Sequence, residues 1–398
     1  MSKAPKLRFK EFSGDWKEKK FNTIFLDIKN KTSDTVKYPL YSLTIENGVV
    51  PKSERYEREF LVTKDEDNFK VVNKNEFVYN PMNLRFGALA RYKGDTSVSV
   101  SGYYNVFKVI DNSPESFWDN YLKTNRMMYI YNTIATGSLI EKRRVHFTQF
   151  IELKLPVPSQ KEQEKIASFF SLIDDKISLQ GEKLRMLKDY KKGIMQKIFS
   201  RELRFKDDEG RDYPEWEVTT IENVADLEKG FTPDTKNEKN WRGDTPWLSI
   251  ADMKQGKYVS DVSKHISYEA LGNKKLVPKG TLIMSFKLTL GRLGIINREM
   301  MTNEAICHFY WKNKNINTEY MYYYLSTVNI ESFGCRAAKG ITLNNDSLNS
   351  IVVKLPVIEE QNKIADILMK IDRKVEKEQE KLDSLNEYKK GLLQQMFV

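Results

Sequence analysis

The chain repeats itself, and this repeat limits its possible folds more than any other feature. The run Ile151-Glu-Leu-Lys-Leu-Pro-Val157 returns as Ile351-Val-Val-Lys-Leu-Pro-Val357. Each copy leads into a tail that contains Gln-x-Lys-Ile-Ala, then Ile-Asp, then Tyr-Lys-Lys-Gly. From Ile166 onward the two tails align at a constant offset of 198 residues. A fixed internal period predicts a fold built twice from one kind of unit.

A shorter repeated segment opens each half. Leu7-Arg-Phe9 leads to Trp16, and Leu203-Arg-Phe205 leads to Trp216. We call these two segments, Leu7–Trp16 and Leu203–Trp216, the stubs. Between each stub and its tail, the two halves of the sequence match only faintly. We therefore divide the chain into a variable domain 1 (1–155), a first tail region (156–200), a variable domain 2 (201–355) and a second tail region (356–398). The similar tails indicate one task done twice, and the dissimilar domains indicate two different tasks.

Both tails are predicted to be long helices that pair. Neither has an internal proline, and apolar residues recur in alternating steps of four and three, the period of a coiled-coil seam. The apolar seam positions are Ile166, Phe170, Ile173, Ile177, Leu184 and Leu187 in the first tail, and Ile364, Leu368, Ile371, Val375, Leu382 and Leu385 in the second. Polar residues interrupt the seam at matched places, namely Gln180 and Lys191, then Glu378 and Lys389. An amphipathic helix packed on any globular core is the alternative.

The order of the segments predicts the direction of the helices. The first helix ends where domain 2 begins, and the second begins where domain 2 ends, so a compact domain 2 requires an antiparallel pair. Forty helical residues span about 60 Å, the length of roughly seventeen base pairs. We expect Val398 to return near the N-terminal stub. The expected fold class is α+β: two mixed α/β domains separated by two long antiparallel coiled-coil helices, with an internal pseudo-twofold repeat.

Composition limits the cellular compartment of the protein and the kind of molecule that it binds. The formal charge of +10 favours an anionic partner, for which nucleic acid is the usual candidate, although many basic proteins bind no DNA. Most of the positive excess lies outside the tails. Two cysteines, Cys307 and Cys335, suit a reducing cytoplasm and exclude a disulfide framework. No apolar run is long enough for a transmembrane helix, so we expect a cytoplasmic protein.

No catalytic or metal site is predicted. The sequence has no Gly-x-x-x-x-Gly-Lys-Ser/Thr phosphate loop, and its histidines and cysteines do not have zinc-ligand spacing. Asn80-Pro-Met-Asn83 faintly resembles the Asn-Pro-Pro-Tyr loop of adenine methyltransferases, but its third and fourth residues differ and no glycine-rich cofactor loop precedes it. We interpret it as a strand end.

Over essentially its whole length the chain resembles the specificity subunit of Type I restriction–modification systems. The resemblance rests on the alternation of two variable domains with two repeated tails. It rests also on the Lys-Leu-Pro junctions at Lys154 and Lys354, on Gly230-Phe-Thr-Pro233, and on Trp241-Arg-Gly-Asp-Thr-Pro-Trp-Leu-Ser-Ile250. Domain 1 departs from the pattern because it lacks Gly-x-Thr-Pro, and Ile358 replaces the second junction proline, Pro158, in the second copy.

The resemblance implies a non-catalytic subunit that recognises DNA. Domains 1 and 2 would be target-recognition domains, each reading one half of a bipartite, asymmetric site in double-stranded DNA. The tails would be the spacer and the docking platform. Two methyltransferase subunits and two ATP-dependent restriction–translocase subunits are the implied partners. The chain itself would need no cofactor, since S-adenosylmethionine and ATP would bind those partners.

Arginine and lysine read guanine edges and bind phosphates, and glycine turns let a backbone approach a ligand closely. Basic residues, several of them beside glycines, are therefore the candidates for DNA contact. They are Arg85, Arg91, Lys142, Arg143 and Arg144 in domain 1, with Lys52, Arg55 and Arg58 as weaker choices, and Lys229, Thr232, Arg242, Lys287, Arg292, Arg336 and Lys339 in domain 2. Solvated surface charge is the alternative for each of them.

A different class of function is an interaction scaffold, in which a coiled coil carries globular ends that bind proteins. Salt separates the two hypotheses, because DNA binding weakens steeply with salt through counterion release. A third hypothesis, a fused restriction–modification enzyme, is disfavoured because the catalytic motifs are missing.

Overall fold

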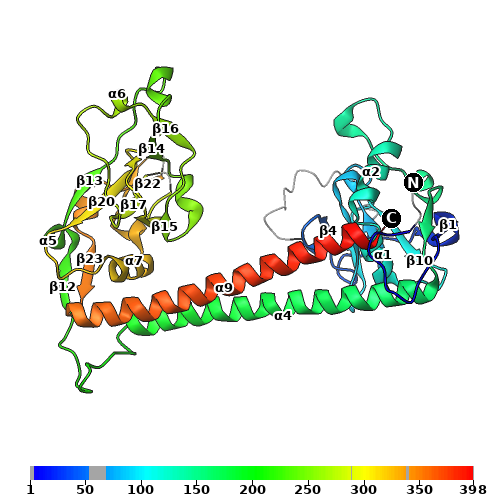
Figure 1. The fold of residues 1–398 in the computed structure, drawn as a ribbon, viewed down its shortest axis with the longest axis horizontal. Helices are drawn as coiled ribbons and strands as arrows, with labels where there is room; N and C mark the ends of the chain where they lie inside the picture. Colours follow the sequence, from blue (N-terminus) through cyan, green and yellow to red (C-terminus); the bar gives the residue numbers. More distant parts are fainter. Residues whose placement is uncertain (1–3, 53–68, 288, 338–339, 398) are drawn as a thin grey trace. The chain divides into compact units, whose positions relative to one another are not determined.

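The computed structural model describes residues 4–52, 69–287, 289–337 and 340–397. The chain divides into two compact units. Unit 1 contains the described residues up to Glu182 and those from Glu380 onward, and unit 2 is Lys183–Gln379. Each unit therefore holds one variable domain and half of each long helix. The long helices are α4 (Gln160–Phe199) and α9 (Ile358–Met396), as Figure 1 shows. None of the described helices is both long and apolar enough to cross a membrane.

In unit 1, antiparallel strands surround an aromatic core. The main sheet has the order β2-β10-β7-β8, and a three-stranded sheet has the order β3-β6-β9. The strands are β1 (Lys17–Lys20), β2 (Phe25–Ile28), β3 (Lys31–Thr32), β4 (Tyr41–Thr44), β5 (Gly48–Pro51), β6 (Phe69–Val72), β7 (Phe77–Tyr79), β8 (Leu89–Arg91), β9 (Val98–Val100), β10 (Asn105–Val109) and β11 (Lys154–Val157). The short helices are η1 (Phe21–Thr23), η4 (Leu84–Phe86), α1 (Glu115–Tyr121), α2 (Asn125–Ile134), η5 (Ile140–Lys142) and α3 (Phe147–Ile151).

Unit 2 has a five-stranded main sheet, β13-β20-β17-β18-β15, and a three-stranded sheet, β16-β14-β19. The strands are β12 (Glu217–Thr220), β13 (Ala225–Lys229), β14 (Thr245–Leu248), β15 (Tyr258–Val259), β16 (Lys264–Ile266), β17 (Leu282–Ser285), β18 (Leu293–Ile296), β19 (Met301–Thr302), β20 (Ile306–Trp311), β21 (Cys335–Ala337), β22 (Gly340–Thr342) and β23 (Val352–Leu355). The short helices are α5 (Ile221–Val224), η6 (Glu238–Trp241), η7 (Asp252–Gln255), α6 (Tyr268–Leu271), α7 (Thr318–Thr327), η8 (Ile330–Phe333) and α8 (Asn345–Asn349). The predicted α+β class with two long helices and a repeated domain is confirmed.

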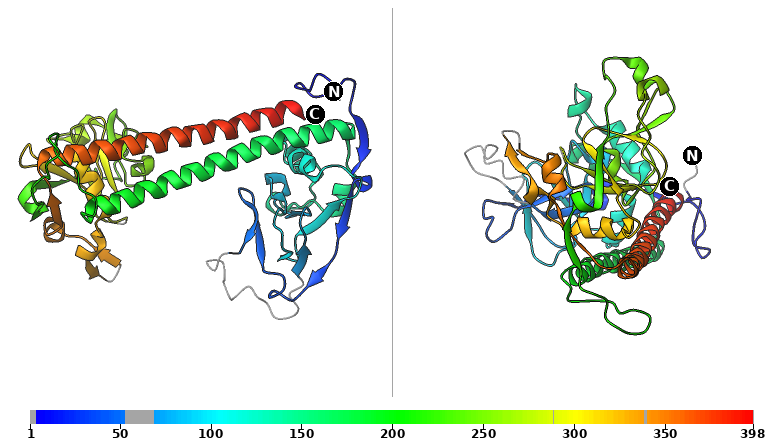
Figure 2. Two further views of the ribbon diagram at one scale, coloured as in Figure 1. Left: turned by 90° about the horizontal axis from the view of Figure 1, so that it is seen from below. Right: turned by 90° about the vertical axis from the view of Figure 1, so that its left-hand side faces the viewer.

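Within each unit, the halves of α4 and α9 lie side by side and antiparallel (Figure 1, Figure 2). In unit 1, Phe170 packs on Phe397 while Lys389, nearer the middle of α9, pairs with Asp174 at 2.5 Å. In unit 2, the partners of Lys183 and Lys191 on α4 are Glu378 and Asp372 on α9, so the numbering falls on one helix as it rises on the other.

All twelve apolar seam positions are buried or half-buried in the structure. Three of the four polar positions have a recorded partner on the opposite helix. Lys191 binds Asp372, and Lys389 binds the equivalent Asp174, each at 2.5 Å. Glu378 pairs with Lys183 at 3.1 Å. Partnered polar residues in a seam favour one register over its neighbours, because a shift would leave them facing apolar side chains.

A buried carboxylate in the first turn of each long helix holds the stub of the preceding domain. In unit 1, the Arg8 guanidinium donates to both oxygens of Glu162, at 2.7 and 2.8 Å, and Trp16 Nε1 donates to Oε1 at 3.3 Å. Glu162 is only 1% exposed. A carboxylate is also favoured at a helix N-terminus by the helix dipole.

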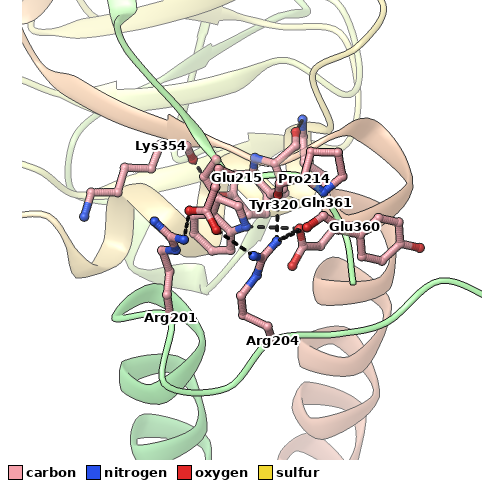
Figure 3. A network of polar contacts seen from close by, with 11 residues as sticks. Arg201, Arg204, Pro214, Glu215, Tyr320, Lys354, Glu360 and Gln361 are labelled. Atoms are coloured by element: carbon pink, nitrogen blue, oxygen red, sulfur yellow. Dashed lines mark hydrogen bonds and ion pairs between the residues drawn. The ribbon is translucent and has the colours of Figure 1, made fainter. Parts of the chain in front are cut away.

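The same arrangement recurs in unit 2 (Figure 3). Glu360 accepts from Arg204 at 3.3 Å and from Trp216 Nε1 at 3.0 Å, and it is fully buried. The backbone follows the repeat as well. Leu203 N donates to the Lys197 carbonyl near the end of α4, and Leu7 N donates to the Gln395 carbonyl near the end of α9, both at 2.9 Å. The N-terminal stub therefore lies at the C-terminal end of α9, in line with the expected return of the chain; Val398 itself lies outside the described residues.

We predict that Glu162→Ala lowers the free energy of unfolding by about 2 to 4 kcal/mol, because it leaves a largely buried guanidinium and an indole N–H without their acceptor. The neighbouring exposed Glu164→Ala is the matched control and should change it by less than about 0.5 kcal/mol. Urea unfolding of the full chain, followed by circular dichroism, measures both. Equal effects of the two substitutions would show that the Glu162 carboxylate does not attach the stub to α4.

Candidate nucleic-acid interface

Four of the candidates in domain 2 gather at one end of its main sheet. Lys229 is the last residue of β13, and Lys287 lies two residues after the end of β17. Their Nζ atoms lie 4.8 and 5.6 Å from the ring centroid of Phe286, which is buried between these strand ends. Thr232 lies three residues beyond Lys229. The Arg292 carbonyl accepts a hydrogen bond from the backbone N–H of Ser285. Lys229 and Lys287 are exposed, so this end of the sheet presents positive charge to solvent.

The loop that carries Thr232 is held in one conformation by its neighbours. A Cβ on Gly230 would lie 2.2 Å from the Thr302 carbonyl, so a side chain there would force the backbone apart. Phe231 N donates to that carbonyl at 2.9 Å, and Asn303 Nδ2 donates to Thr232 Oγ1 at 2.9 Å. Trp247 Nε1 donates to the Phe231 carbonyl at 2.8 Å. The Gly230-Phe-Thr-Pro233 segment is therefore rigid, as a surface that reads base edges needs to be.

Asn303 is a functional candidate that the sequence analysis missed. Its backbone and side chain connect the Thr232 loop to β14 and β19, since Asn303 N donates to the Leu248 carbonyl. The sequence carried no signal for it, because Thr232 and Asn303 are distant in the chain and meet only when the two sheets pack.

Arg292 and Arg242 have different environments. Arg292 is half-buried, and its Nη1 donates to the Ile250 carbonyl at 3.3 Å, so part of its guanidinium supports the fold. Arg242 is exposed and pairs with Glu238 at 2.6 Å, one helical turn earlier. It borders a pocket of about 560 Å³ with Trp241 and Lys264. The side chain of Arg336, on β21, is not described, and Lys339 lies outside the described residues.

In domain 1, Arg91 has internal partners. Its Nη1 donates to Asn75 Oδ1 at 3.0 Å, and its Nε lies 3.6 Å from the buried carboxylate of Asp119. Lys93 and Lys123 approach the same carboxylate at 3.3 and 2.6 Å. Burial opposes ionisation of Asp119, but these three cations together lower its pKa. Arg91 therefore has a structural partner, and the two lysines are the more exposed members of the cluster.

The remaining domain 1 candidates lie at a turn. The Arg85 guanidinium lies 4.5 Å from the ring centroid of Phe86, which is 59% exposed. Lys142 ends η5, Arg143 is half-buried and Arg144 is exposed. Val145 N donates to the Pro81 carbonyl, which brings this run beside the turn that precedes Arg85. That turn includes Asn80, directly after β7, as the strand-end interpretation expects. Among the weaker choices, Lys52 is exposed, and Arg55 and Arg58 lie outside the described residues.

Two reactive residue types lie in the domain 2 core. Burial raises the pKa of the Cys307 thiol to about 12 and lowers the pKa of His308 to about 4. His308 Nε2 lies 2.7 Å from Thr302 Oγ1 beneath the rigid loop. In the described part of the chain, no group of three histidine, cysteine or acidic side chains could hold a metal ion.

We predict that Gly230→Ala weakens DNA binding by about tenfold or more, because the new Cβ displaces the loop that carries Thr232. Gly193→Ala is the matched control, since a Cβ there meets nothing within 4 Å. Fluorescence anisotropy with labelled duplex DNA and the complex assembled on each variant measures the difference. If the two variants bind DNA with equal affinity, the Gly230–Pro233 loop is not part of the DNA interface.

Comparisons with known proteins agree with this arrangement. A family model described as "Type I restriction modification DNA specificity domain" matches the chain twice, over residues 14–189 and 213–387. A putative type I restriction enzyme MjaX specificity subunit from Methanocaldococcus jannaschii is 24% identical over 98% of this chain and 94% of its own length. The MjaIX specificity subunit of the same organism is 26% identical over 50% of this chain, which spans about half (48%) of that relative's length.

Solved structures share the fold. A Type I restriction–modification S subunit from M. genitalium superposes with a TM-score of 0.57 at 14% identity, covering 99% of each chain. A chain from a structural study of complex assembly and conformational transition in the type I R-M system gives the same TM-score at 14% identity, covering 95% of this chain and 96% of its own.

Proposed function

Because the chain belongs to the Type I restriction modification DNA specificity family, we propose that it selects the DNA sequence on which a Type I restriction–modification complex acts. Each variable domain would read one half of a bipartite, asymmetric site. The α4–α9 pair would set the gap between the halves. The observation that carries the proposal is the exposed basic end of the domain 2 sheet, with its rigid Gly230–Pro233 loop.

The proposed division of labour leaves catalysis to partner subunits. Two methyltransferase subunits would dock on the tails and bind S-adenosylmethionine, and two restriction–translocase subunits would bind ATP. This chain would contribute neither catalytic residues nor a cofactor. Large apolar side chains on α4 support docking: Leu172, Leu179 and Met186, each seven residues apart, are 69%, 67% and 55% exposed. A spacing of seven places them on one helix face.

The alternative function is a protein-binding scaffold. A positive surface and a paired-helix frame are compatible with acidic protein partners too. Counterion release from DNA distinguishes the two functions, because it gives a linear fall of log K with log salt whose slope counts the phosphates neutralised.

We predict that Lys229→Ala and Lys287→Ala each reduce that slope by about one, as expected when one phosphate contact is lost. Lys377→Ala, an exposed lysine of α9, is the matched control and should leave the slope unchanged. Binding of the assembled methyltransferase complex to duplex DNA at several salt concentrations gives the slopes. If the DNA affinity of the wild-type complex does not change with salt concentration, the protein-binding scaffold is favoured.

We predict that replacing domain 2 (about 206–350) by that of another family member changes one half of the DNA site and preserves the other. Each half-site would depend on one domain only. Genome-wide mapping of N6-methyladenine in cells with the chimaera and a cognate methyltransferase subunit reads out both halves. A simultaneous change of both halves would overturn the assignment of one domain to one half-site.

A further inference from the structure

In unit 2, a connected set of polar contacts links domain 2 to both long helices. Tyr323, on α7, donates its hydroxyl hydrogen to Asp372 of α9 at 2.5 Å. Lys257, just before β15, donates to the same hydroxyl at 3.0 Å. On the other side, Asp372 pairs with Lys191 of α4 at 2.5 Å. We call Lys257, Tyr323 and Asp372 the brace.

Further contacts hold the domain end of the brace. Lys257 forms an ion pair with Glu319, and Tyr258 donates to Glu319 Oε1 at 2.6 Å. Tyr258 also approaches the Met369 sulfur of α9 at 3.9 Å. The Lys257 side chain is only 10% exposed, and its ammonium lies 4.3 Å from the Tyr323 ring centroid. The Lys257 contacts are therefore largely shielded from water and stronger than a surface ion pair, whereas Tyr258 is 45% exposed.

Protonation keeps Tyr323 a hydrogen-bond donor. Burial, the hydrogen bond to Asp372 and the nearby acidic charges all raise its pKa far above neutrality. The hydroxyl therefore donates to the Asp372 carboxylate and accepts from the Lys257 ammonium. Phenylalanine would fill the same space and make neither bond.

Unit 1 provides an internal comparison. In each unit, two aromatic residues four apart pack on a phenylalanine at the C-terminal end of the opposite long helix. Phe117 and Tyr121 of α1 pack on Phe397, directly after α9, and Tyr320 and Tyr324 of α7 pack on Phe199, the last residue of α4. This match aligns α1 with α7. The residue equivalent to Tyr323 is then Asn120, whose side chain donates to the Ser116 carbonyl of its own helix.

In unit 1, small residues replace the contacts that hold the domain end of the brace. Ser116 stands where Glu319 would be, and Ser171 stands at the repeat position of Met369. Both line a groove of about 470 Å³ beside α4. Asp174, the counterpart of Asp372, keeps its lysine partner, Lys389. The salt bridge between the helices is thus common to both units, whereas among the described residues the tyrosine link to the domain occurs in unit 2 alone.

We propose that Tyr323 is a positioning residue that fixes domain 2 on the helix pair and thereby fixes the gap between its half-site and the rest of the DNA site. The inference rests on the proposed function. Domain 2 is also attached near Glu360, and its apolar core packs on α9 from Ile364 to Ile371. Asp372 adds a polar attachment twelve residues beyond Glu360, about 18 Å away. Two attachments this far apart prevent pivoting. A pivot of about ten degrees moves a point 20 Å away by roughly 3.4 Å, one base pair.

The test compares methylation of DNA sites that have the natural gap between the half-sites (right-gap) with methylation of sites whose gap is one base pair longer or shorter (wrong-gap). The full chain is assembled with its cognate methyltransferase subunit, and a pool of duplexes carries both half-sites with the natural gap or with one base pair more or less. We expect Tyr323→Phe and Asp372→Asn to raise the ratio of wrong-gap to right-gap methylation by about tenfold, as expected from losing a hydrogen bond to a charged group. The ratio is internal to each variant, so partial misfolding does not change it.

Asp174→Asn is the matched control. It removes the equivalent helix–helix salt bridge but no tyrosine contact, so its ratio should equal that of the wild type. An unchanged ratio in Tyr323→Phe, or an equal rise in Asp174→Asn, would overturn the inference while leaving the proposed function in place. A wild-type complex that methylates no two-part site would refute the proposed function, and this inference with it.

Discussion

A buried carboxylate in the first turn of each long helix joins that helix to the domain before it. Glu162 and Glu360 sit at equivalent repeat positions, and each binds an arginine and a tryptophan from the stub of its own domain. Burying a carboxylate is costly unless charged and hydrogen-bonding partners meet it. The stub, the strand that enters the helix and the helix itself must therefore assemble together, which gives both units the same framework.

On this framework the two units differ in how firmly the variable domain is held. Both share the lysine–aspartate bridges that set the helix register. The tyrosine link is present in unit 2, whereas the equivalent residue of unit 1, Asn120, bonds within its own helix. Duplication conserves what both halves need, and each domain is then free to evolve its own attachment and its own surface. Under the proposed function, this difference would let one chain with a repeated frame serve an asymmetric site.

The helices were predictable because a period of 3.5 extends over the whole of both tails, and the matched polar interruptions indicated a partner helix. The sequence repeat revealed the stubs. Their role in attaching each domain to its helix could be recognised only from the fold, because Arg8 and Glu162 lie far apart in the sequence. The DNA-contact candidates were less predictable. Composition cannot distinguish Lys229, which is exposed, from Arg91, which is bound to Asn75 and Asp119. Asn303 depends on loop packing that no local pattern encodes.

The most direct test of sequence selection is a genome-wide map of N6-methyladenine in cells that express this chain with a cognate methyltransferase subunit, compared with cells that lack only this chain. The account predicts a new two-part motif with a fixed gap that appears only when the chain is present. If the complex assembles and no new motif appears, the chain does not select DNA sequence, and the paired helices and basic surface serve protein partners instead.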